Sequence, residues 1–164
     1  MRFEHVIDVN APEDAGEVQT MTRAQVWQGL WLRAWCPDRL PNGPSACECT
    51  PVKGLPDGIH QLQRVLRFGA HEFHDTVELH ASGRVQFTPK PHDESAPIRL
   101  TVTLSEPQAG QPRLTFVYEA MAELSEEEAT YSGYRQNAWR HMDHDMVDTW
   151  RVWLAQGAWP VDQA

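Results

Sequence analysis

The stretch SEEEATYSGYRQNAWRHMDHDMVDTWRVWLAQG, residues 125–157, predicts one long amphipathic helix. Ser125 can cap its start, and the three glutamates that follow suit the positive end of the helix dipole. Gly157 and Pro160 end the pattern. The side expected to pack on the rest of the molecule is a stripe rich in aromatic and methionine side chains, namely Arg135, Trp139, Met142, Met146, Trp150 and Trp153.

The middle of this helix, WRHMDHDMVD, carries two histidines and three aspartates. His141, His144, Asp145 and Asp148 have the i, i+3, i+4, i+7 spacing of one helix face, opposite or beside the apolar stripe. Such side chains are ordinary on a face that meets water, so we predict neither a metal site nor a cofactor here. Bound Mg²⁺ or adventitious Zn²⁺ is the less favoured alternative. At a cavity mouth, His141 or Asp145 could still touch a ligand.

The rest of the chain predicts one further helix and a series of strands. Residues 2–10 alternate with the period of a strand, and the polar residues 11–20 predict a loop. A Thr22–Gln25 capping box precedes the helical segment AQVWQGLWLRAW. Short alternating runs separated by turn residues follow at 45–53, 58–69, 72–80, 84–89, 97–106 and 112–122. Consecutive strands without helices between them indicate antiparallel hairpins.

Composition excludes some classes of partner. The 164 residues carry a formal charge of −9 without a basic stripe, which disfavours binding to nucleic acid or to an anionic membrane. No apolar run reaches the length of a membrane span, and the first ten residues do not resemble a signal peptide. Three cysteines argue against a disulfide framework, so we expect a reduced, cytoplasmic protein, with Cys47 and Cys49 packing on one face of a strand.

The order of elements predicts an α+β fold. A single seven-stranded antiparallel sheet must bury one face, and the C-terminal helix is the only element long enough to cover it. A twisted sheet wrapped around a helix leaves a space in which a ligand can bind. We expect one domain over residues 1–157 and a tail at 158–164.

Three motifs carry a resemblance to a known family. MTRAQVWQGLWLRA (21–34) followed by Pro37, LQRVLRFG (62–69) and LTFVYE (114–119) are similar to the first helix and two strands of the AtaL-like branch of the START/polyketide-cyclase (SRPBCC, helix-grip) superfamily. The resemblance extends over nearly the whole chain. It implies a hollow sheet that grips the C-terminal helix around an apolar cavity. Relatives bind lipids, hormones or polyketides, and some catalyse cyclisation or dehydration; the resemblance implies no catalytic residue.

The strand register predicts which side chains line that cavity. With a two-residue loop at 70–71, Phe68 faces Phe73, Leu66 faces Asp75, Arg64 faces Val77 and Leu62 faces Leu79. Later hairpins pair Leu79 with Val85, Val77 with Phe87, Val102 with Phe116 and Leu100 with Tyr118. In the first strand, the inward side is assigned to Phe3, Ile7 and Val9. The inner face is then apolar except for Arg64, Asp75 and Tyr118.

These polar exceptions are the predicted anchor of a ligand. A buried Arg64 needs an anion, which Asp75 supplies from a diagonal position, and Tyr118 can donate a hydrogen bond. A structural ion pair, or an arginine that reaches solvent, is the alternative. The tryptophans are more typical of core than of a pocket. The predicted ligand-binding residues are Arg64, Asp75, Tyr118, Phe116, Phe73, Trp139, Met142 and Met146.

Three functions fit this sequence. The favoured one is binding of a small hydrophobic or amphipathic molecule between the sheet and the C-terminal helix. The second is a cyclase, aromatase or hydro-lyase acting on a polyketide-like carbonyl substrate, with Asp75 as base and Arg64 or Tyr118 stabilising the enolate. The third is a protein-interaction domain, with a homodimer formed through an exposed sheet face or edge.

Overall fold

A computed structural model describes residues 1–11, 19–91 and 96–159. Its elements are β1 (Arg2–Asp8), α1 (Arg23–Trp35), a 3₁₀ turn η1 (Pro37–Arg39), β2 (Ala46–Pro51), β3 (Ile59–Phe68), β4 (His71–His80), β5 (Arg84–Pro89), β6 (Ile98–Gln108), β7 (Gln111–Ala120) and α2 (Glu126–Ala155). The predicted tail at 158–164 and loop at 11–20 lie largely outside the described residues.

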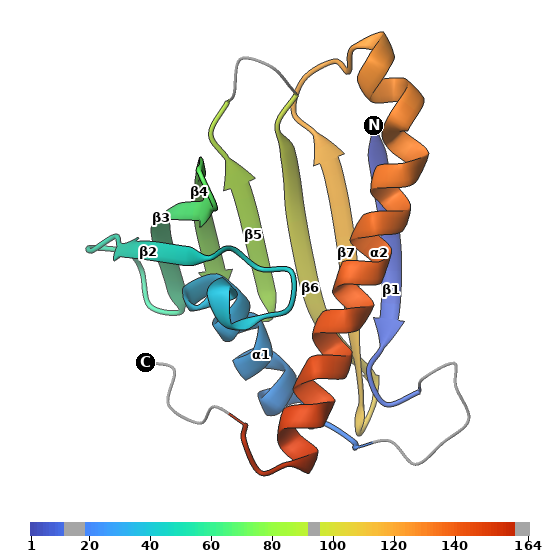
Figure 1. Cartoon of the computed structure of the whole chain (residues 1–164). Coiled ribbons are helices and arrows are strands. Elements are labelled where there is room, and N and C mark those ends of the chain that lie inside the picture. Colours follow the sequence, from blue (N-terminus) through green and yellow to red (C-terminus); the bar gives the residue numbers. More distant parts are fainter. Residues whose placement is uncertain (12–18, 92–95, 160–164) are drawn as a thin grey trace.

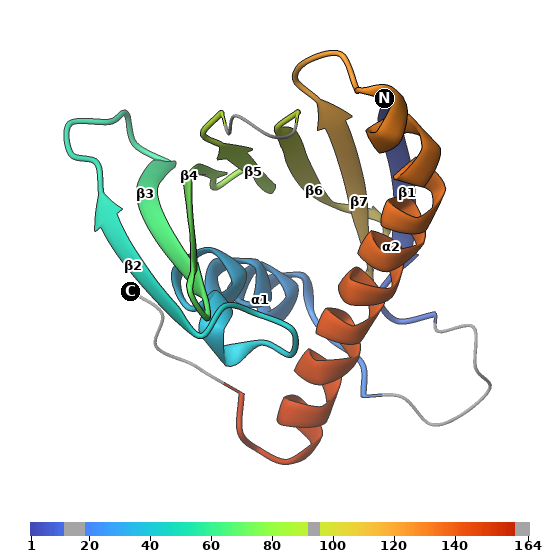
Figure 2. The ribbon, with the colours of Figure 1, turned by 45° about the horizontal axis from the view of Figure 1, so that its top comes forward.

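The strands form one antiparallel sheet in the order β1-β7-β6-β5-β4-β3-β2. Figure 1 shows α2 running alongside the β1 and β7 end of this sheet, while α1 lies across the lower part of its concave side. In Figure 2 the sheet curves around the space that the two helices border. The predicted α+β helix-grip architecture, with seven antiparallel strands and a long C-terminal helix, is confirmed.

Both helices begin at the capping boxes that the sequence predicts. The Thr22 hydroxyl accepts a hydrogen bond from the backbone N–H of Gln25, whose side chain accepts one from the N–H of Thr22. Ser125 and Glu128 repeat this arrangement at the start of α2. These bonds satisfy N–H groups that have no partner within the helix. The second helix ends at Ala155, two residues before Gly157.

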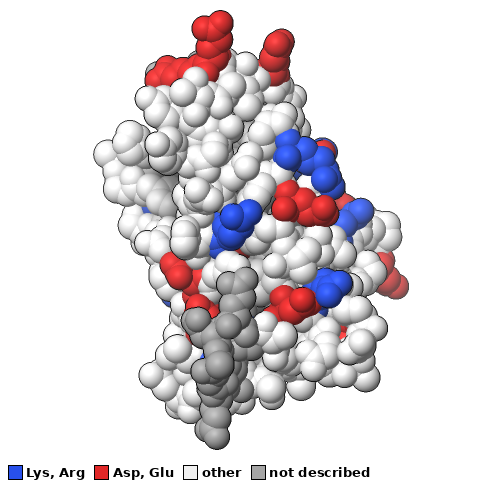
Figure 3. Space-filling model, turned by 90° about the vertical axis from the view of Figure 1, so that its right-hand side faces the viewer, with Lys and Arg blue, Asp and Glu red and all other residues white. Residues whose placement is uncertain are grey.

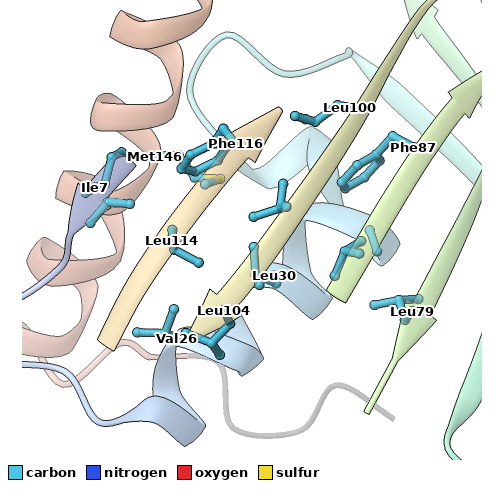
Figure 4. Close-up of a cluster of buried hydrophobic side chains, with 14 of the residues drawn as sticks. Ile7, Val26, Leu30, Leu79, Phe87, Leu100, Leu104, Leu114, Phe116 and Met146 are labelled. Atoms are coloured by element: carbon cyan, nitrogen blue, oxygen red, sulfur yellow. The ribbon is translucent and has the colours of Figure 1, made fainter. Parts of the chain in front are cut away.

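The core forms where alternate strand residues meet the inner faces of the helices. Figure 4 shows side chains from both helices and the sheet meeting in one cluster, including Ile7, Leu79, Phe87, Leu100, Leu104, Leu114, Phe116, Val26, Leu30 and Met146. The outward residues of β1 are exposed and its inward residues are buried, so period-two alternation sets the two faces.

The register of the β3–β4 hairpin differs from the prediction by two residues. Arg64 lies directly opposite Asp75, and Leu66 lies opposite Phe73, because the turn is formed by Gly69 and Ala70 rather than by residues 70 and 71. Gly69 has φ +61°, which suits the first central position of a type II′ turn. A shift of two keeps every side chain on its predicted face. The register predicted for the later hairpins is confirmed.

The two helices approach each other closely at Gly29. Trp150 of α2 is fully buried against this position, and a Cβ atom on Gly29 would lie 2.6 Å from Trp150 Cε2. No side chain fits there, so the glycine permits the helix contact.

The predicted packing stripe of α2 is correct at most positions. Met146 and Trp150 are buried and Trp139 is half-buried, but Met142 is 44% exposed. The predicted polar face is confirmed at His141, Asp145 and Asp148, which are exposed, whereas His144 is half-buried. Figure 3 views the side of the molecule on which α2 lies, and its acidic and basic side chains are interspersed without a continuous basic stripe.

Candidate functional site

A chamber of about 250 Å³ lies between the sheet, α2 and the segment that follows α1; we call it the inner chamber. Most of its wall is apolar. Its lining residues are Arg33, Pro37, Leu40, Pro41, Asn42, Gly43, Pro44, Arg64, Leu66, Phe68, Asp75, Phe87, Leu100, Met142, Asp143 and Met146. Two arginines and two aspartates are thus set among apolar side chains, an arrangement typical of a site for a small organic molecule.

The first ion pair joins Arg64 of β3 to Asp75 of β4. Nε and Nη2 of Arg64 donate to the two carboxylate oxygens of Asp75 at 2.8 and 2.6 Å, and both residues are buried. Nη1 donates to the backbone carbonyls of Arg33 and Ala34 at 3.0 and 2.8 Å. These carbonyls are in the last turn of α1 and have no partner within the helix. Arg64 therefore links two strands to the end of α1.

The second polar cluster centres on Asp143 of α2, which is 1% exposed. Its Oδ1 accepts a hydrogen bond from Arg33 Nη1 at 3.0 Å. Its Oδ2 accepts from Tyr118 Oη at 2.6 Å and from His5 Nε2 at 2.8 Å. The carboxylate thus joins β1, α1, β7 and α2, and it satisfies the requirement that a buried charge be paired.

The surroundings shift the pKa of two groups in this cluster, Tyr118 and Arg33. Burial raises the pKa of Tyr118, and the charge of Asp143 raises it further while Arg33 opposes it, so the phenol stays a hydrogen-bond donor at physiological pH. Burial acts to lower the pKa of Arg33, but Asp143 and Tyr118 outweigh it, and the pKa is raised. His5 donates through Nε2, and its buried Nδ1 has no hydrogen-bond partner among the described residues.

Aromatic rings pack around both clusters. Tyr118 stacks on Trp139 with ring centroids 4.4 Å apart, and His5 stacks on Phe116 at 4.8 Å. The guanidinium groups of Arg33 and Arg64 lie 5.4 and 5.3 Å from the centre of the Phe87 ring. The ring therefore favours the positive charges of both arginines.

The remaining predicted ligand-binding residues fall in three places. Met142 and Met146 line the inner chamber, and the Sδ atom of Met146 lies 3.6 Å from Arg33 Nη1. Phe116 is fully buried in the core, and Trp139 packs against Tyr118. Phe73 is 46% exposed near the tip of the β3–β4 hairpin, where its ring meets that of Phe68 edge to face.

A second, larger hollow adjoins the inner chamber and shares Leu66 and Asp75 with it. This outer chamber has a volume of about 750 Å³. Its lining residues are Leu66, His71, Glu72, Phe73, His74, Asp75, Pro89, Lys90, Pro91, Ala96, Pro97, Ile98 and Arg135. It carries more charged and polar side chains than the inner chamber, so the apolar body of a ligand is better accommodated inside.

Three site residues were not predicted from the sequence: His5, Arg33 and Asp143. Alternation in residues 2–10 places His5 on the inward side of the strand, and this pattern is the signal that identifies it. Asp143 lies four residues after Trp139 and three before Met146, so it belongs to the packing stripe and not to the polar face. The pairing of Arg33 with Asp143 connects distant segments and leaves no local pattern.

Two other sequence predictions concern metals and membranes. Across residues 1–11, 19–91 and 96–159, no group of three or more His, Cys, Asp or Glu side chains is arranged to hold a metal ion. Within the same ranges, neither helix combines the length and the apolar character that crossing a membrane demands.

An antiparallel sheet that curves around a long C-terminal helix and borders a pocket beside it defines a helix-grip protein. Residues 7–157 match the family model of AtaL, described as acetylaranotin biosynthesis cluster protein L, and the chain belongs to this family. No curated protein matches the chain.

Solved structures with the same fold have low sequence identity to this chain. The di-domain ARO/CYC StfQ from the steffimycin biosynthetic pathway superposes with a TM-score of 0.63 and 10% identity; the match covers 94% of this chain but 52% of StfQ, so the chain spans about half of that protein. The Zhui aromatase/cyclase from Streptomyces sp. R1128 superposes with a TM-score of 0.56 and 12% identity, and the match covers 94% of this chain and 95% of Zhui. Ara h 8.0201 superposes with a TM-score of 0.53 and 10% identity, and the match covers 95% of this chain and 98% of Ara h 8.0201.

Proposed function

We propose that this protein binds a small hydrophobic or amphipathic molecule in the inner chamber. The observation that carries the proposal is the chamber itself, in which Leu66, Leu100 and Met146 provide apolar surface beside the buried arginine–aspartate pairs. Apolar walls favour the body of a ligand through the hydrophobic effect, and a few fixed polar groups orient it. Arg64 and Asp75 serve as the polar edge of the site, together with Arg33 and Asp143.

A matched pair of substitutions tests this proposal. Leu66 lines both chambers, while its neighbour Val65 is similarly half-buried on the opposite face of β3. An apolar fluorescent probe should bind the native protein saturably. Leu66→Trp should weaken binding at least tenfold by filling the space, and Val65→Trp should leave the Kd within about twofold.

Two results would contradict the proposal. One is the absence of saturable binding across a panel of planar and long-chain hydrophobes, which favours an interaction domain. The other is an equal effect of the two substitutions, which places the probe elsewhere. The emission of the probe, not of tryptophan, is recorded, because each variant gains a tryptophan.

An enzymatic function is the second candidate. Two proteins of similar fold are described as aromatase/cyclases, and here a carboxylate and a guanidinium stand side by side on the chamber wall. In an aldol cyclisation, Asp75 would remove a proton from carbon between two carbonyls, and Arg64 would stabilise the enolate oxygen. The enolate carbon then bonds to a second carbonyl carbon, whose oxygen takes up the proton, and loss of water follows.

Product analysis separates the two functions. A poly-β-ketone analogue incubated with the protein should yield a cyclised, dehydrated product faster than buffer does if the protein is a cyclase. Asp75→Asn should then abolish this excess rate while probe binding persists. A rate equal to buffer, with intact probe binding, supports the binding function alone.

A further inference from the structure

We infer that the inner chamber selects an uncharged ligand, such as a phenol or a ketone on a ring system, over carboxylates and amines. This inference rests on the proposed binding function and adds the chemical class of the ligand. Each arginine of the chamber already has its own carboxylate, so neither is an unbalanced charge that would attract a carboxylate ligand.

The charges on the wall of the inner chamber cancel. Among the described residues that line it, Arg33 and Arg64 are positive and Asp75 and Asp143 are negative. Each arginine contacts an aspartate within hydrogen-bonding distance, at 3.0 Å for Arg33 and 2.6 Å for Arg64. The chamber therefore presents dipoles of fixed direction and no net charge to a ligand.

Arg64 and Asp143 have little hydrogen-bonding capacity left. A guanidinium has five N–H groups, and the four hydrogen bonds of Arg64 to Asp75 and to two α1 carbonyls engage four of them. Asp143 accepts from three donors. On Arg64 the N–H that remains, on Nη2, suits one neutral oxygen, not the bidentate grip that a carboxylate requires, and the charge of Arg33 is balanced by Asp143, which its Nη1 contacts at 3.0 Å.

A charged ligand meets a penalty that a neutral ligand avoids. A carboxylate would lose its hydration, meet Asp75 and Asp143, and compete with them for arginines that hold them in place. An ammonium group would meet the two arginines in the same way. A hydroxyl or ketone oxygen needs only one or two hydrogen bonds and loses far less hydration.

The size of the chamber indicates suitable probes. Its volume of about 250 Å³ exceeds the roughly 150 Å³ of an apolar cavity that holds benzene, so a two-ring aromatic body is appropriate. Three ligands share such a body and differ in charge: 2-naphthol, 2-naphthoic acid and 2-(aminomethyl)naphthalene. Their binding to the native protein can be compared by calorimetry at pH 7.5.

The expected order of affinity follows from the charges. Naphthol should bind at least tenfold tighter than the acid or the amine. Between pH 6 and pH 8 the affinity of the acid should fall about tenfold per unit, because only its protonated form enters and its carboxyl group titrates near pH 4. Equal affinities, or a tighter acid with no such pH dependence, would overturn the inference and leave the proposed function standing. If neither these ligands nor an apolar probe binds, the inference and the proposed binding function both fail.

Asp75→Asn provides an independent test. It leaves one net positive charge on the chamber wall, so the affinity of naphthoate relative to naphthol should rise at least tenfold. Glu72→Gln, on the same strand but lining only the outer chamber, should leave the ratio unchanged. An unchanged ratio in folded Asp75→Asn overturns the inference. If that variant does not fold, the comparison of the three ligands on the native protein decides.

Discussion

Two buried carboxylates, Asp75 and Asp143, hold the arginines of the inner chamber. Both pairs cross between elements, so each contributes to the stability of the fold as well as to the wall of the inner chamber. Arg64 is the more tightly constrained arginine, because it also binds the carbonyls at the end of α1. The charged groups are therefore part of the structure of the fold as well as of the chamber wall.

Removal of Asp75 should be costly. Asp75→Ala leaves Arg64 charged and buried without its anion, which should lower the free energy of unfolding by about 3 kcal/mol in urea titrations. Replacing both residues with apolar side chains of similar volume should recover much of this loss. The control is Glu72→Ala on the same strand, which removes exposed ion pairs to Arg67 and His74 and should leave the urea midpoint unchanged. A double variant no more stable than Asp75→Ala would contradict this explanation.

The raised pKa of Tyr118 predicts a loss of stability in alkali. The unfolded chain releases this proton near its ordinary pKa of about 10, while the folded protein retains it, so above pH 10 the folded state binds more protons and its stability falls as pH rises. Below pH 10 both states are protonated and the contribution is fully present. Above pH 10, Tyr118→Phe should therefore make the free energy of unfolding fall less steeply with pH, by up to about 1.4 kcal/mol per pH unit. Urea titrations between pH 9 and pH 11 give the free energy of unfolding of both proteins. If it falls with pH equally steeply in the native protein and in Tyr118→Phe, this assignment is refuted.

The sequence predicts the inward position of half of the six polar residues that form the two clusters. The positions of Arg64, Asp75 and Tyr118 follow from alternation, which depends only on parity along a strand. Asp143 was missed because its stretch contains several acidic and histidine side chains, and helical spacing alone assigns most of them to water. Only the three-dimensional structure shows that His5, Arg33 and Tyr118 meet this one carboxylate.

Helices and strands were more predictable than the contacts between them. Capping boxes and turn residues mark the ends of elements, so bounds such as those of α1 agree within a residue or two with the prediction. The β3–β4 register was wrong by two because the apolar pattern fixes the face of each strand but not the location of the turn. The contact of α1 with α2 depends on Gly29, whose importance is visible only beside Trp150.

Two glycines in helices should respond in opposite ways to alanine. Gly29→Ala should destabilise the protein by about 1–3 kcal/mol, because the new Cβ overlaps the Trp150 ring and the loss outweighs the gain in helix propensity. Gly133→Ala in α2 has open space around it and should stabilise by about 0.5–1 kcal/mol. Thermal unfolding of the two variants measures both effects. A Gly29→Ala protein as stable as the parent would show that α2 can move away without loss.

Both chambers are formed between elements that come from distant parts of the chain. The fold was predicted because hydrophobic periodicity, turn chemistry and a family resemblance all indicate it. The identity of the ligand was not, because the chamber is formed by side chains brought together only on folding.

Ligand binding should stabilise the entire fold. A molecule that binds only the folded state adds about 2.7 kcal/mol at a free concentration of 100 times its Kd, so the Tm should rise with concentration. At the same concentration a tenfold loss of affinity in Leu66→Trp should reduce this gain to about 1.4 kcal/mol or less, and Val65→Trp should retain it. A shift of equal size in both variants would indicate binding outside the chambers.

The pairing of β1 with β7 also bears on how the protein is made. The ribosome synthesises β1 well before β7, the strand with which β1 forms hydrogen bonds. His5 of β1 likewise cannot form its hydrogen bond until Asp143, 138 residues later, has been synthesised. Until then the nascent chain carries an unfinished sheet with open edges and exposed apolar faces. Such long-range contacts slow folding and leave intermediates prone to aggregation. Chaperones that shield nascent chains, and lower growth temperatures, should therefore raise the yield of folded protein. A substitution that stabilises a single hairpin should raise it less.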